Sequence, residues 1–223
     1  MLRIAIDGPG GAGKSSLAKA LAKKLGIIYV DTGALYRTVG YYVRECGADP
    51  KNENEVVPLL KNINIELVFE NGVQNVYLNG ENLGDKIRQP DISMYASAVS
   101  ALMPVREFLL ETQKRLSMSK PGVIMDGRDI GSVVLPLADV KFFMTADPAI
   151  RANRRYQELL AKGEQVSYEA VEENVRKRDY LDEHRTVSPL VRVPEAVFVD
   201  TGNMTVEEVV TYMLNVIQEH YAG

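Results

Sequence analysis

Cysteine, histidine and tryptophan are almost missing from this sequence. Its 223 residues include one cysteine, two histidines and no tryptophan. A single cysteine excludes an intrachain disulfide, and we expect Cys46 to be a small, buried apolar residue in a reducing compartment. The histidines and the cysteine lie too far apart in the sequence for a zinc pattern. We expect His184 and His220 to have surface or structural roles rather than catalytic ones.

Two further absences narrow the function classes. No apolar run approaches the roughly 20 residues that a membrane-spanning helix needs, so we expect no membrane partner. The net charge of −4 disfavours a general nucleic-acid-binding protein. The chain enters a strand-like run at residue 2, from which we expect no signal peptide and a cytoplasmic location.

Apolar runs and helical patterns alternate along most of the chain. Runs typical of buried strands occur at 2–7, 27–30, 123–125, 140–144 and 197–199. Helical patterns occur at about 16–26, 32–46, 53–62, 90–101, 104–117, 148–161, 168–182 and 205–219. This alternation predicts an α/β fold, with a five-stranded parallel sheet and helices on both of its faces. The length and the 46% hydrophobic content suit one such domain.

The stretch at about 64–84 departs from this alternation. Asn71-Gly72 and Asn79-Gly80 follow short strand-like runs, and both residue types tolerate a positive φ. The stretch therefore predicts a small antiparallel meander, inserted into the parallel fold.

The first predicted strand is followed by a glycine-rich loop that fits the phosphate-binding pattern G-x-x-x-x-G-K-[ST]. Glycines let the backbone wrap an anion, and the next helix directs its free N–H groups at the same phosphates. Lysine adds positive charge for the β- and γ-phosphates, and a serine hydroxyl is a candidate magnesium ligand. The alternative, a turn that binds nothing, is disfavoured by the flanking strand and helix. The loop comprises Gly8, Pro9, Gly10, Gly11, Ala12, Gly13, Lys14, Ser15 and Ser16.

Polar residues follow several of the predicted strands. In open parallel sheets, ligands bind at the carboxyl ends of the strands. The polar clusters are Asp7, Asp31-Thr32, 126–129 and 200–202, and Thr32 is also a candidate N-cap for the next helix. These clusters predict a binding site at that edge of the sheet.

Arginines are concentrated late in the chain, where seven of the fourteen lie between residues 151 and 192. Arg151, Arg154 and Arg155 have the i, i+3, i+4 spacing of one helix face, before the glycine-containing loop at 160–164. We expect this segment to close over ATP as a lid. The alternative is a solvated charged face that pairs with nearby glutamates.

A second group of charges exceeds what one ATP needs. Arg178, Asp182 and Arg185 follow helical spacing, and Arg37 and Arg128 add two more cations. We therefore predict a second phosphorylated substrate. Phosphoryl transfer between two nucleotides requires positioning and charge neutralisation more than a catalytic base.

Four motifs occur in order along the chain, at 8–16, 31–37, 126–131 and 178–185. In residues and order they resemble the signatures of the bacterial-type cytidylate kinases, and the resemblance covers nearly the whole length. It implies the nucleoside monophosphate kinase fold: a P-loop NTP hydrolase-like core, a monophosphate-binding region with the β insertion, and a short lid. The implied core comprises 1–36, 103–150 and 166–223, the monophosphate-binding region 37–102, and the lid 151–165.

The activity implied by the resemblance is transfer of the ATP γ-phosphate to CMP or dCMP, in pyrimidine nucleotide metabolism. Magnesium is the implied cofactor, with ATP as co-substrate. We expect these small molecules to be the partners of a monomeric protein.

The resemblance also implies roles for the charged residues. Arg37, Arg128 and Arg185 would hold the acceptor phosphate, and Arg178 and Asp182 would hold the pentose. The arginines with implied catalytic roles, together with Lys14, are Arg128, Arg185, Arg154 and Arg155, of which the last two would contact ATP phosphates from the lid.

Cytosine would be recognised by Asp129, Ser97 and Arg106. A carboxylate suits the exocyclic amine of cytosine, a donor that uracil lacks. Ser97 has a rival interpretation, as a helix serine bonded to its own turn. Thr32 would lie in the acceptor site, where many family members have serine.

Magnesium would be held through water by Asp126, with Asp7 and Asp31 as weaker rivals. Many family members have glycine and threonine where this chain has Ser15-Ser16, so either serine is a candidate direct ligand. Three alternatives to a CMP kinase stay open: a kinase for another monophosphate or small metabolite, a non-catalytic ATP-binding switch, and a structural module.

Overall fold

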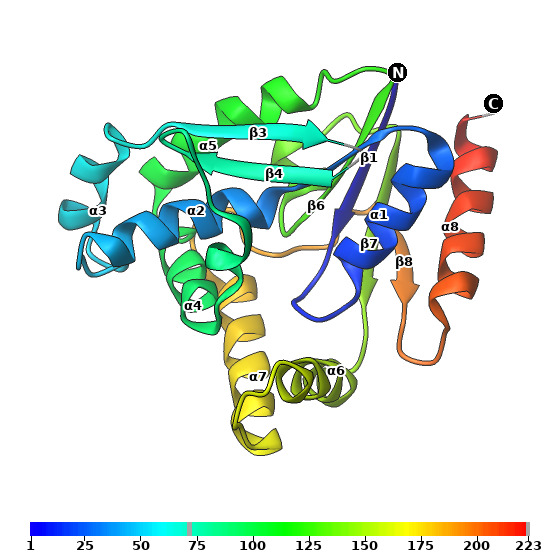
Figure 1. The fold of residues 1–223 in the computed structure, drawn as a ribbon. Helices are drawn as coiled ribbons and strands as arrows, with labels where there is room; N and C mark the ends of the chain where they lie inside the picture. The colour runs from blue at the N-terminus through cyan, green and yellow to red at the C-terminus, as the bar shows by residue number, and fades with distance from the viewer. Residues whose placement is uncertain (71–72, 222–223) are drawn as a thin grey trace.

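The computed structural model of the chain describes residues 1–70 and 73–221. Its centre is a parallel sheet of five strands in the order β2, β6, β1, β7, β8 (Figure 1). The strands are β1 (Leu2–Asp7), β2 (Ile28–Asp31), β6 (Gly122–Gly127), β7 (Val140–Thr145) and β8 (Val197–Asp200). The predicted five-stranded parallel sheet is confirmed.

Helices α1 (Lys14–Leu25) and α8 (Val206–Tyr221) cover one face of this sheet (Figure 1). Leu17 and Leu21 of α1 and Met213 of α8 pack in one core with Ile4 and Phe142 of the central strands. All five side chains are buried. The 3.6-residue spacing of the apolar positions in both helices is what brings them onto the sheet.

The opposite face is covered by α5 (Met103–Leu116), β3 (Ile65–Glu70) and a short π-helical segment, η2 (Ile130–Val134). Val30 and Met125 of the sheet form a core with Ile130 and Val134, and Leu110 of α5 packs against it. Strands buried on both faces explain the nearly continuous apolar runs in the sequence.

The predicted insertion is an antiparallel sheet of β3, β4 (Val73–Leu78) and β5 (Glu81–Asn82). Asn79 and Gly80 turn between β4 and β5 with φ values of 51° and 85°, the left-handed region that asparagine and glycine tolerate best. The turn predicted at Asn71-Gly72 lies outside the described residues. The antiparallel meander is therefore present where the sequence predicts it.

A second apolar core lies beneath this insertion. It is formed with α2 (Thr32–Glu45), α3 (Glu53–Leu60), α4 (Pro90–Val99) and the 3₁₀-helix η1 (Gly84–Arg88). Val105 and Leu109 of α5 belong to the same core. The division of the chain into core, monophosphate-binding region and lid at the bounds given above stays a prediction.

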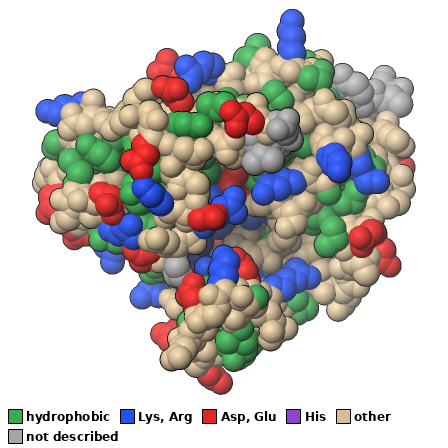
Figure 2. Space-filling view, viewed as in Figure 1, with side chains coloured by type: hydrophobic (Ala, Val, Ile, Leu, Met, Phe, Trp, Pro, Cys, Tyr) green, Lys and Arg blue, Asp and Glu red, His purple; other side chains and the backbone are tan. Residues whose placement is uncertain are grey.

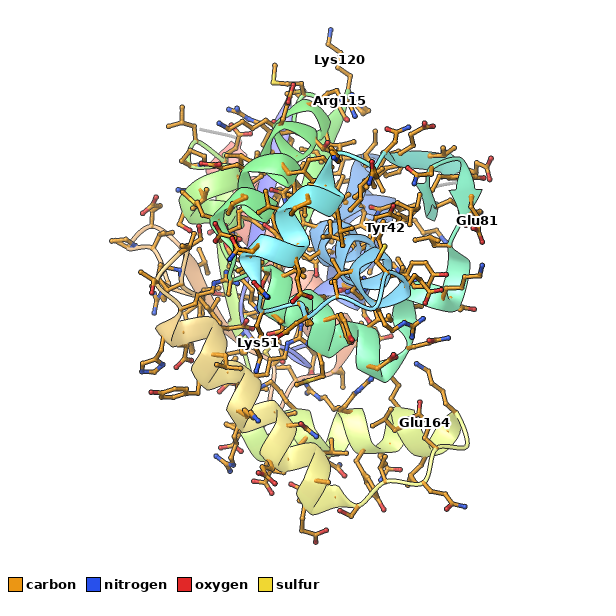
Figure 3. The ribbon with its side chains drawn as sticks, turned by 90° about the vertical axis from the view of Figure 1, so that its left-hand side faces the viewer. Tyr42, Lys51, Glu81, Arg115, Lys120 and Glu164 are labelled. Carbon is orange, nitrogen blue, oxygen red and sulfur yellow. The ribbon has the colours of Figure 1, made fainter. Side chains whose placement is uncertain are left out.

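Helices α6 (Pro148–Ala161) and α7 (Tyr168–His184) pack against each other beyond the carboxyl ends of the strands (Figure 1). Figure 3 shows Glu164, in the loop between them, at the outer end of this pair. The pair thus projects from the edge of the sheet at which ligands of parallel sheets bind.

Two local expectations are wrong. Asp31, not Thr32, is the N-cap of α2, and its Oδ1 accepts the backbone N–H of Ala34 at 3.0 Å. Cys46 is exposed rather than buried, because it lies just beyond the last turn of α2. Over 1–70 and 73–221, the helices are all too short or too polar to span a membrane.

Candidate active site

The phosphate-binding loop joins β1 to α1, and its glycines have the conformations that only glycine adopts easily. Gly8, Gly11 and Gly13 have φ values of 146°, 77° and 85°. A Cβ atom on Gly8 would lie 1.9 Å from the carbonyl oxygen of Met144, so β7 leaves no space for a side chain there. The loop backbone is therefore held close to the sheet, directly before the first N–H groups of α1.

Lys14 is buried at the start of α1. Its Nζ donates to the carbonyl oxygens of Gly8 and Pro9, at 2.8 and 2.7 Å. Burial, and next the charge of Arg128, lower the pKa of Lys14 to about 7. A bound phosphate would favour the charged form of this amine, so the site is suited to an anion.

The next residue, Ser15, faces a buried carboxylate on β6. Ser15 Oγ donates to Asp126 Oδ2 at 2.8 Å, and the hydroxyl of Tyr29 donates to Asp126 Oδ1 at 2.8 Å. Burial, and next the charge of Asp31, raise the pKa of Asp126. Ser16 is exposed. Of the two candidate serines, Ser15 is the one beside the predicted carboxylate.

The two rival carboxylates have other partners. Asp7 accepts the backbone N–H groups of Ile130 and Gly131, each at 2.7 Å, and so holds the segment that follows β6. Asp31 caps α2 and accepts a 2.6 Å hydrogen bond from Arg37. Asp126 is therefore the carboxylate best placed for a hard cation beside the loop.

The residues around Ser15 fit magnesium. A hydroxyl and a carboxylate oxygen are hard ligands, and Mg²⁺ in such sites keeps waters and binds substrate phosphates as well. Among residues 1–70 and 73–221, no three His, Cys, Asp or Glu side chains form a complete metal cage.

A cleft near the phosphate-binding loop lies between the C-terminal end of α7 and residues of α2, α4, α5 and the end of β6. Figure 2 shows acidic and basic side chains gathered in this hollow. Residues from four separate parts of the chain line it, including all nine predicted CMP-binding residues. Its lining is Thr32, Gly33, Tyr36, Arg37, Ala96, Ser97, Ser100, Arg106, Gly127, Arg128, Asp129, Arg178, Asp182 and Arg185.

One side of the cleft carries a buried ion pair. Asp129 and Arg106 are 4% and 7% exposed, and Arg106 Nη2 donates to Asp129 Oδ2. Arg106 also donates to the carbonyl oxygen of Ser100 at 3.0 Å and lies over the ring of Tyr36, 5.5 Å from its centroid. These contacts hold the carboxylate of Asp129 in one place, so that its remaining lone pairs are available to a ligand.

Helix α7 supplies the opposite side. Arg128 Nε donates to Asp182 Oδ2 at 2.7 Å, and Arg185 Nη1 lies 4.0 Å from Asp182 Oδ1. Burial alone would raise the pKa of Asp182, but Arg128 and Arg178 hold it below its usual range. Arg185 also donates to the carbonyl oxygen of Ser188 at 2.7 Å. Arg178 and Asp182 lie on α7, but the helix ends at His184 and Arg185 follows it with an extended ψ of 142°, so the expected helical spacing does not reach Arg185. All three residues nevertheless line the cleft.

Three arginines in the cleft keep a buried nitrogen without a partner within the described part of the chain. These atoms are Arg37 Nε, Arg178 Nε and Arg185 Nη2. Burial, and next the charge of Arg128, lower the pKa of Arg178 to about 10. Unpartnered buried N–H groups and crowded cations are both relieved by an anion, so this end of the cleft is suited to a phosphate.

Arg128 and Arg178 of the cleft also approach the phosphate-binding loop. A Cβ atom on Gly10 would lie 3.5 Å from Arg128 Nη2 and 4.0 Å from Arg178 Nη1. Two guanidinium groups therefore lie between the loop and the cleft. An anion in the cleft and a second anion on the loop would share these charges.

The predicted lid arginines are not brought into the cleft. Arg154 donates to Thr201, through Nη1 to Oγ1 at 3.2 Å and through Nη2 to the carbonyl oxygen at 2.7 Å. Arg155 pairs with Glu158 at 2.9 Å, as the solvated-face alternative expects. His184 is exposed and stacks on Tyr180.

Sequence reasoning missed several residues of the site. Tyr29 and Tyr36 are aromatic residues in apolar stretches, which predict burial but not their contacts with Asp126 and Arg106. Ser100 follows α4 and carries no motif. Thr32 is predicted for the acceptor site and lines the cleft, but the sequence does not indicate that its Oγ1 donates to the carbonyl oxygen of Asp126, at 2.7 Å. Only the tertiary contacts reveal these partners.

Two solved structures share this architecture. An uncharacterised protein from Eubacterium ventriosum has a TM-score of 0.52 at 13% identity, covering 98% of this chain and 99% of that one. Shikimate kinase from Acinetobacter baumannii has a TM-score of 0.50 at 18% identity, covering 98% and 94%. At such identities the likeness shows the fold alone, and the second structure is a kinase.

Sequence relatives are much more similar. Cytidylate kinase from Fervidobacterium nodosum is 45% identical over 217 residues, 97% of this chain and 96% of the relative. Cytidylate kinase from Carboxydothermus hydrogenoformans is 46% identical over 216 residues, 97% of each chain. A family model described as cytidylate kinase matches residues 4–219. With this match over almost its whole length, the chain belongs to the cytidylate kinase family.

Proposed function

We propose that the protein transfers the γ-phosphoryl group of ATP to CMP or dCMP, which gives CDP or dCDP. One observation carries this proposal beyond family membership: Arg128 and Arg178 lie between the phosphate-binding loop and a cleft that contains a buried carboxylate. Phosphoryl transfer needs a donor and an acceptor phosphate brought together in a field of fixed positive charge. A non-catalytic switch has no use for the second cationic site, and it is not favoured.

The acceptor phosphate would be held by Arg37, Arg128 and Arg185. Arginine binds phosphate through paired N–H groups, and Arg37 and Arg185 each have a buried nitrogen free for such a contact. Their charges would lower the electrostatic repulsion between the acceptor phosphate and ATP. Arg178 and Asp182 would hold the pentose, and Arg178 is also close enough to the loop to stabilise the transferred group.

The base would be read by Asp129, with Arg106 and Ser97. A carboxylate oxygen of Asp129 would accept a hydrogen bond from the exocyclic amine of cytosine, and the carbonyl oxygen at the same position of uracil would repel it. Arg106 would hold Asp129 in its reading position, since the two are already paired. Ser97 lines the cleft on α4.

ATP would bind through the loop and α1. Lys14 would exchange its contacts with Gly8 and Pro9 for the β- and γ-phosphates. Magnesium, when bound, would neutralise charge on the phosphates, with Ser15 as its direct protein ligand and Asp126 held one water away. Arg154 and Arg155 would contact ATP phosphates after leaving Thr201 and Glu158. We further propose that the protein acts as a monomer, because one chain supplies both sites, and that it works in the cytoplasm, where its nucleotide substrates are found.

Product formation with different acceptors tests the reaction. ADP release from MgATP should be fast with CMP and dCMP, and slow with UMP, AMP or no acceptor. Lys14→Ala should reduce turnover almost to background while the circular dichroism spectrum stays unchanged. Folded protein with no acceptor-dependent turnover would contradict the proposal.

Asp129→Asn tests the reading of the base. This change removes the negative charge but keeps the size of the side chain, and the preference for CMP over UMP should fall roughly 10- to 100-fold. Asp85→Ala is the matched control, because the Asp85 side chain is 99% exposed and outside the cleft. An unchanged preference in Asp129→Asn would remove this residue from the proposed base site.

A further inference from the structure

Arg151, on α6, is buried and joins three separate segments of the chain. Its side chain is 3% exposed. Nε donates to the carbonyl oxygen of Ala146 at 2.7 Å, and Nη1 donates to that of Gly10 at 3.1 Å. Nη1 and Nη2 donate to Asp179 Oδ1 and Oδ2, at 3.0 and 2.7 Å. The guanidinium therefore links the start of α6, the phosphate-binding loop and α7.

The bond to Asp179 has the paired geometry that arginine forms with a carboxylate. Two parallel N–H···O contacts define both distance and orientation, which a lysine ammonium does not do. The pair is shielded from water, because the Asp179 side chain is only 14% exposed. A buried pair of this kind is a specific connection rather than a solvated surface contact.

The bond between Arg151 and Asp179 holds a part of the chain that contains residues of the cleft. Arg178 precedes Asp179 on α7, Asp182 lies one turn further along the same helix, and Arg185 directly follows the last residue of α7. These three residues line the cleft. The position of α7 relative to the phosphate-binding loop thus sets the distance between the acceptor site and the donor phosphates.

The phosphate-binding loop also packs closely on α6 at this point. A Cβ atom on Gly11 would lie 3.2 Å from Arg151 Cβ, which is tighter than ordinary side-chain contact. Arg151 thereby contacts the loop through its Cβ and through its guanidinium. Arg154 and Arg155, one turn later on α6, make neither contact.

We infer that Arg151 and Asp179 form a positioning pair, which aligns the acceptor site on α7 with the phosphate-binding loop. The inference rests on the proposed phosphoryl transfer, and it assigns these residues no contact with either substrate. Misalignment of reacting groups by about 1 Å costs on the order of 100-fold in rate, while each substrate still finds its own contacts. Loss of the pair should therefore lower kcat far more than it changes either KM.

Arg151→Lys and Asp179→Asn test this role, because both keep the size and a hydrogen-bonding group at each position. We expect kcat for CMP phosphorylation to fall about 100-fold in each variant, with KM for ATP and CMP within about 3-fold of the original values. The double variant should be no slower than the slower single variant, since both changes break one connection. Arg176→Lys is the matched control: it alters an exposed ion pair with Glu172 on the same helix and should leave kcat unchanged.

Three results would overturn the inference. These are an unchanged kcat in both variants, a kcat loss equal to that of Arg176→Lys, or a KM for ATP that rises while kcat stays constant. The last result would mean that Arg151 binds ATP directly. If Arg151→Lys does not fold, as judged by circular dichroism, Asp179→Asn decides by the same criteria. Absence of CMP-dependent turnover in the unmodified protein would instead contradict the proposed function.

Discussion

Ser15 and Ser16, which follow each other on α1, are both exposed, but within the described part of the chain only Ser15 donates a hydrogen bond to Asp126, at 2.8 Å. The two serines are adjacent in sequence, so the turn of the helix alone decides which one faces the carboxylate. This relationship separates two candidate magnesium ligands that the sequence leaves equivalent.

Ser15→Ala should therefore weaken the response to magnesium, and Ser16→Ala should not. Loss of a ligand or of a residue that orients one costs roughly 10- to 100-fold in metal affinity, so Ser15→Ala should need correspondingly more magnesium for half-maximal activity. Binding of Mn²⁺ in the presence of ATP, followed by electron paramagnetic resonance, gives a readout independent of turnover. Equal Mn²⁺ affinity in the two variants would contradict the assignment of Ser15.

Tyr29→Phe should have a smaller effect of the same kind. The change removes the hydroxyl that donates to Asp126 Oδ1 and leaves the ring packed in the core. Without this hydrogen-bond donor the carboxylate of Asp126 would rotate more freely. Its unsatisfied buried oxygen would lower the free energy of unfolding by about 1–3 kcal/mol. We expect the magnesium requirement to rise several-fold while KM for CMP stays constant.

Thermal unfolding and magnesium titration of Tyr29→Phe measure the two effects separately. Tyr156→Phe offers a comparison, because this tyrosine is outside the cleft and away from Asp126. The role of Tyr29 would be refuted by identical magnesium dependence in both variants.

The stability of the protein should depend on pH through Asp7. Burial raises the pKa of Asp7 from 3.8 to about 6, although its bonds from Gly131 and Ile130 oppose the shift. The folded protein then binds this proton more tightly than the unfolded chain does. The stability contributed by Asp7 is therefore fully present below pH 3.8 and is lost as the pH rises through about 6.

Urea unfolding of the original protein and of Asp7→Asn isolates this contribution. The difference in their free energies of unfolding, original minus variant, should be larger at about pH 5 than at about pH 7.5. The reason is that the amide introduced in the variant does not titrate. A constant difference would show that the carboxyl titrates near its ordinary value, and a difference that grows with pH would show that folding lowers its pKa; either result would contradict the raised pKa.

Gly40→Ala should destabilise the protein and weaken CMP binding. A Cβ atom on Gly40 would lie 2.8 Å from the backbone nitrogen of Ala96 and 3.0 Å from the carbonyl carbon of Tyr95. The added methyl must push α4 away from α2, which costs about 1–3 kcal/mol. Because α4 carries Ser97, KM for CMP should rise and KM for ATP should stay unchanged.

The sign of the change in stability shows whether Gly40 is in close contact with α4 or lies at an open helix position. In an open helix position, glycine to alanine stabilises by about 1 kcal/mol, because alanine has the better helix propensity. A higher midpoint of thermal unfolding in Gly40→Ala would therefore mean that the two helices are not in close contact.

Much of the fold could be predicted from local patterns. Helix α6 begins at Pro148 and ends at Ala161, where proline and the apolar spacing place it. Thr205 and Glu208, a threonine and a glutamate three residues apart, exchange the two hydrogen bonds of a capping box. Such features depend on residues a few positions apart, so the sequence contains their cause.

The charged residues of the site could be predicted by type but not by partner. Arg151, Arg154 and Arg155 form one cluster in the sequence, yet Arg151 binds Asp179, Arg154 binds Thr201 and Arg155 binds Glu158. The three side chains leave α6 in slightly different directions, and their guanidinium groups therefore reach different partners. No spacing rule contains that information.

The sequence by itself determined the parallel sheet, the phosphate-binding loop and the antiparallel insertion, because periodicity and glycine conformation depend on residues close together in the chain. It also determined the family, because the order of the motifs can be read directly from the sequence. Only the tertiary structure decided that Asp126 faces Ser15, that Asp7 and Asp31 serve the backbone and Arg37, and that Arg151 connects α7 to the loop. These choices depend on which side chains meet in the folded chain, and buried carboxylates such as Asp7 and Asp126 require such partners.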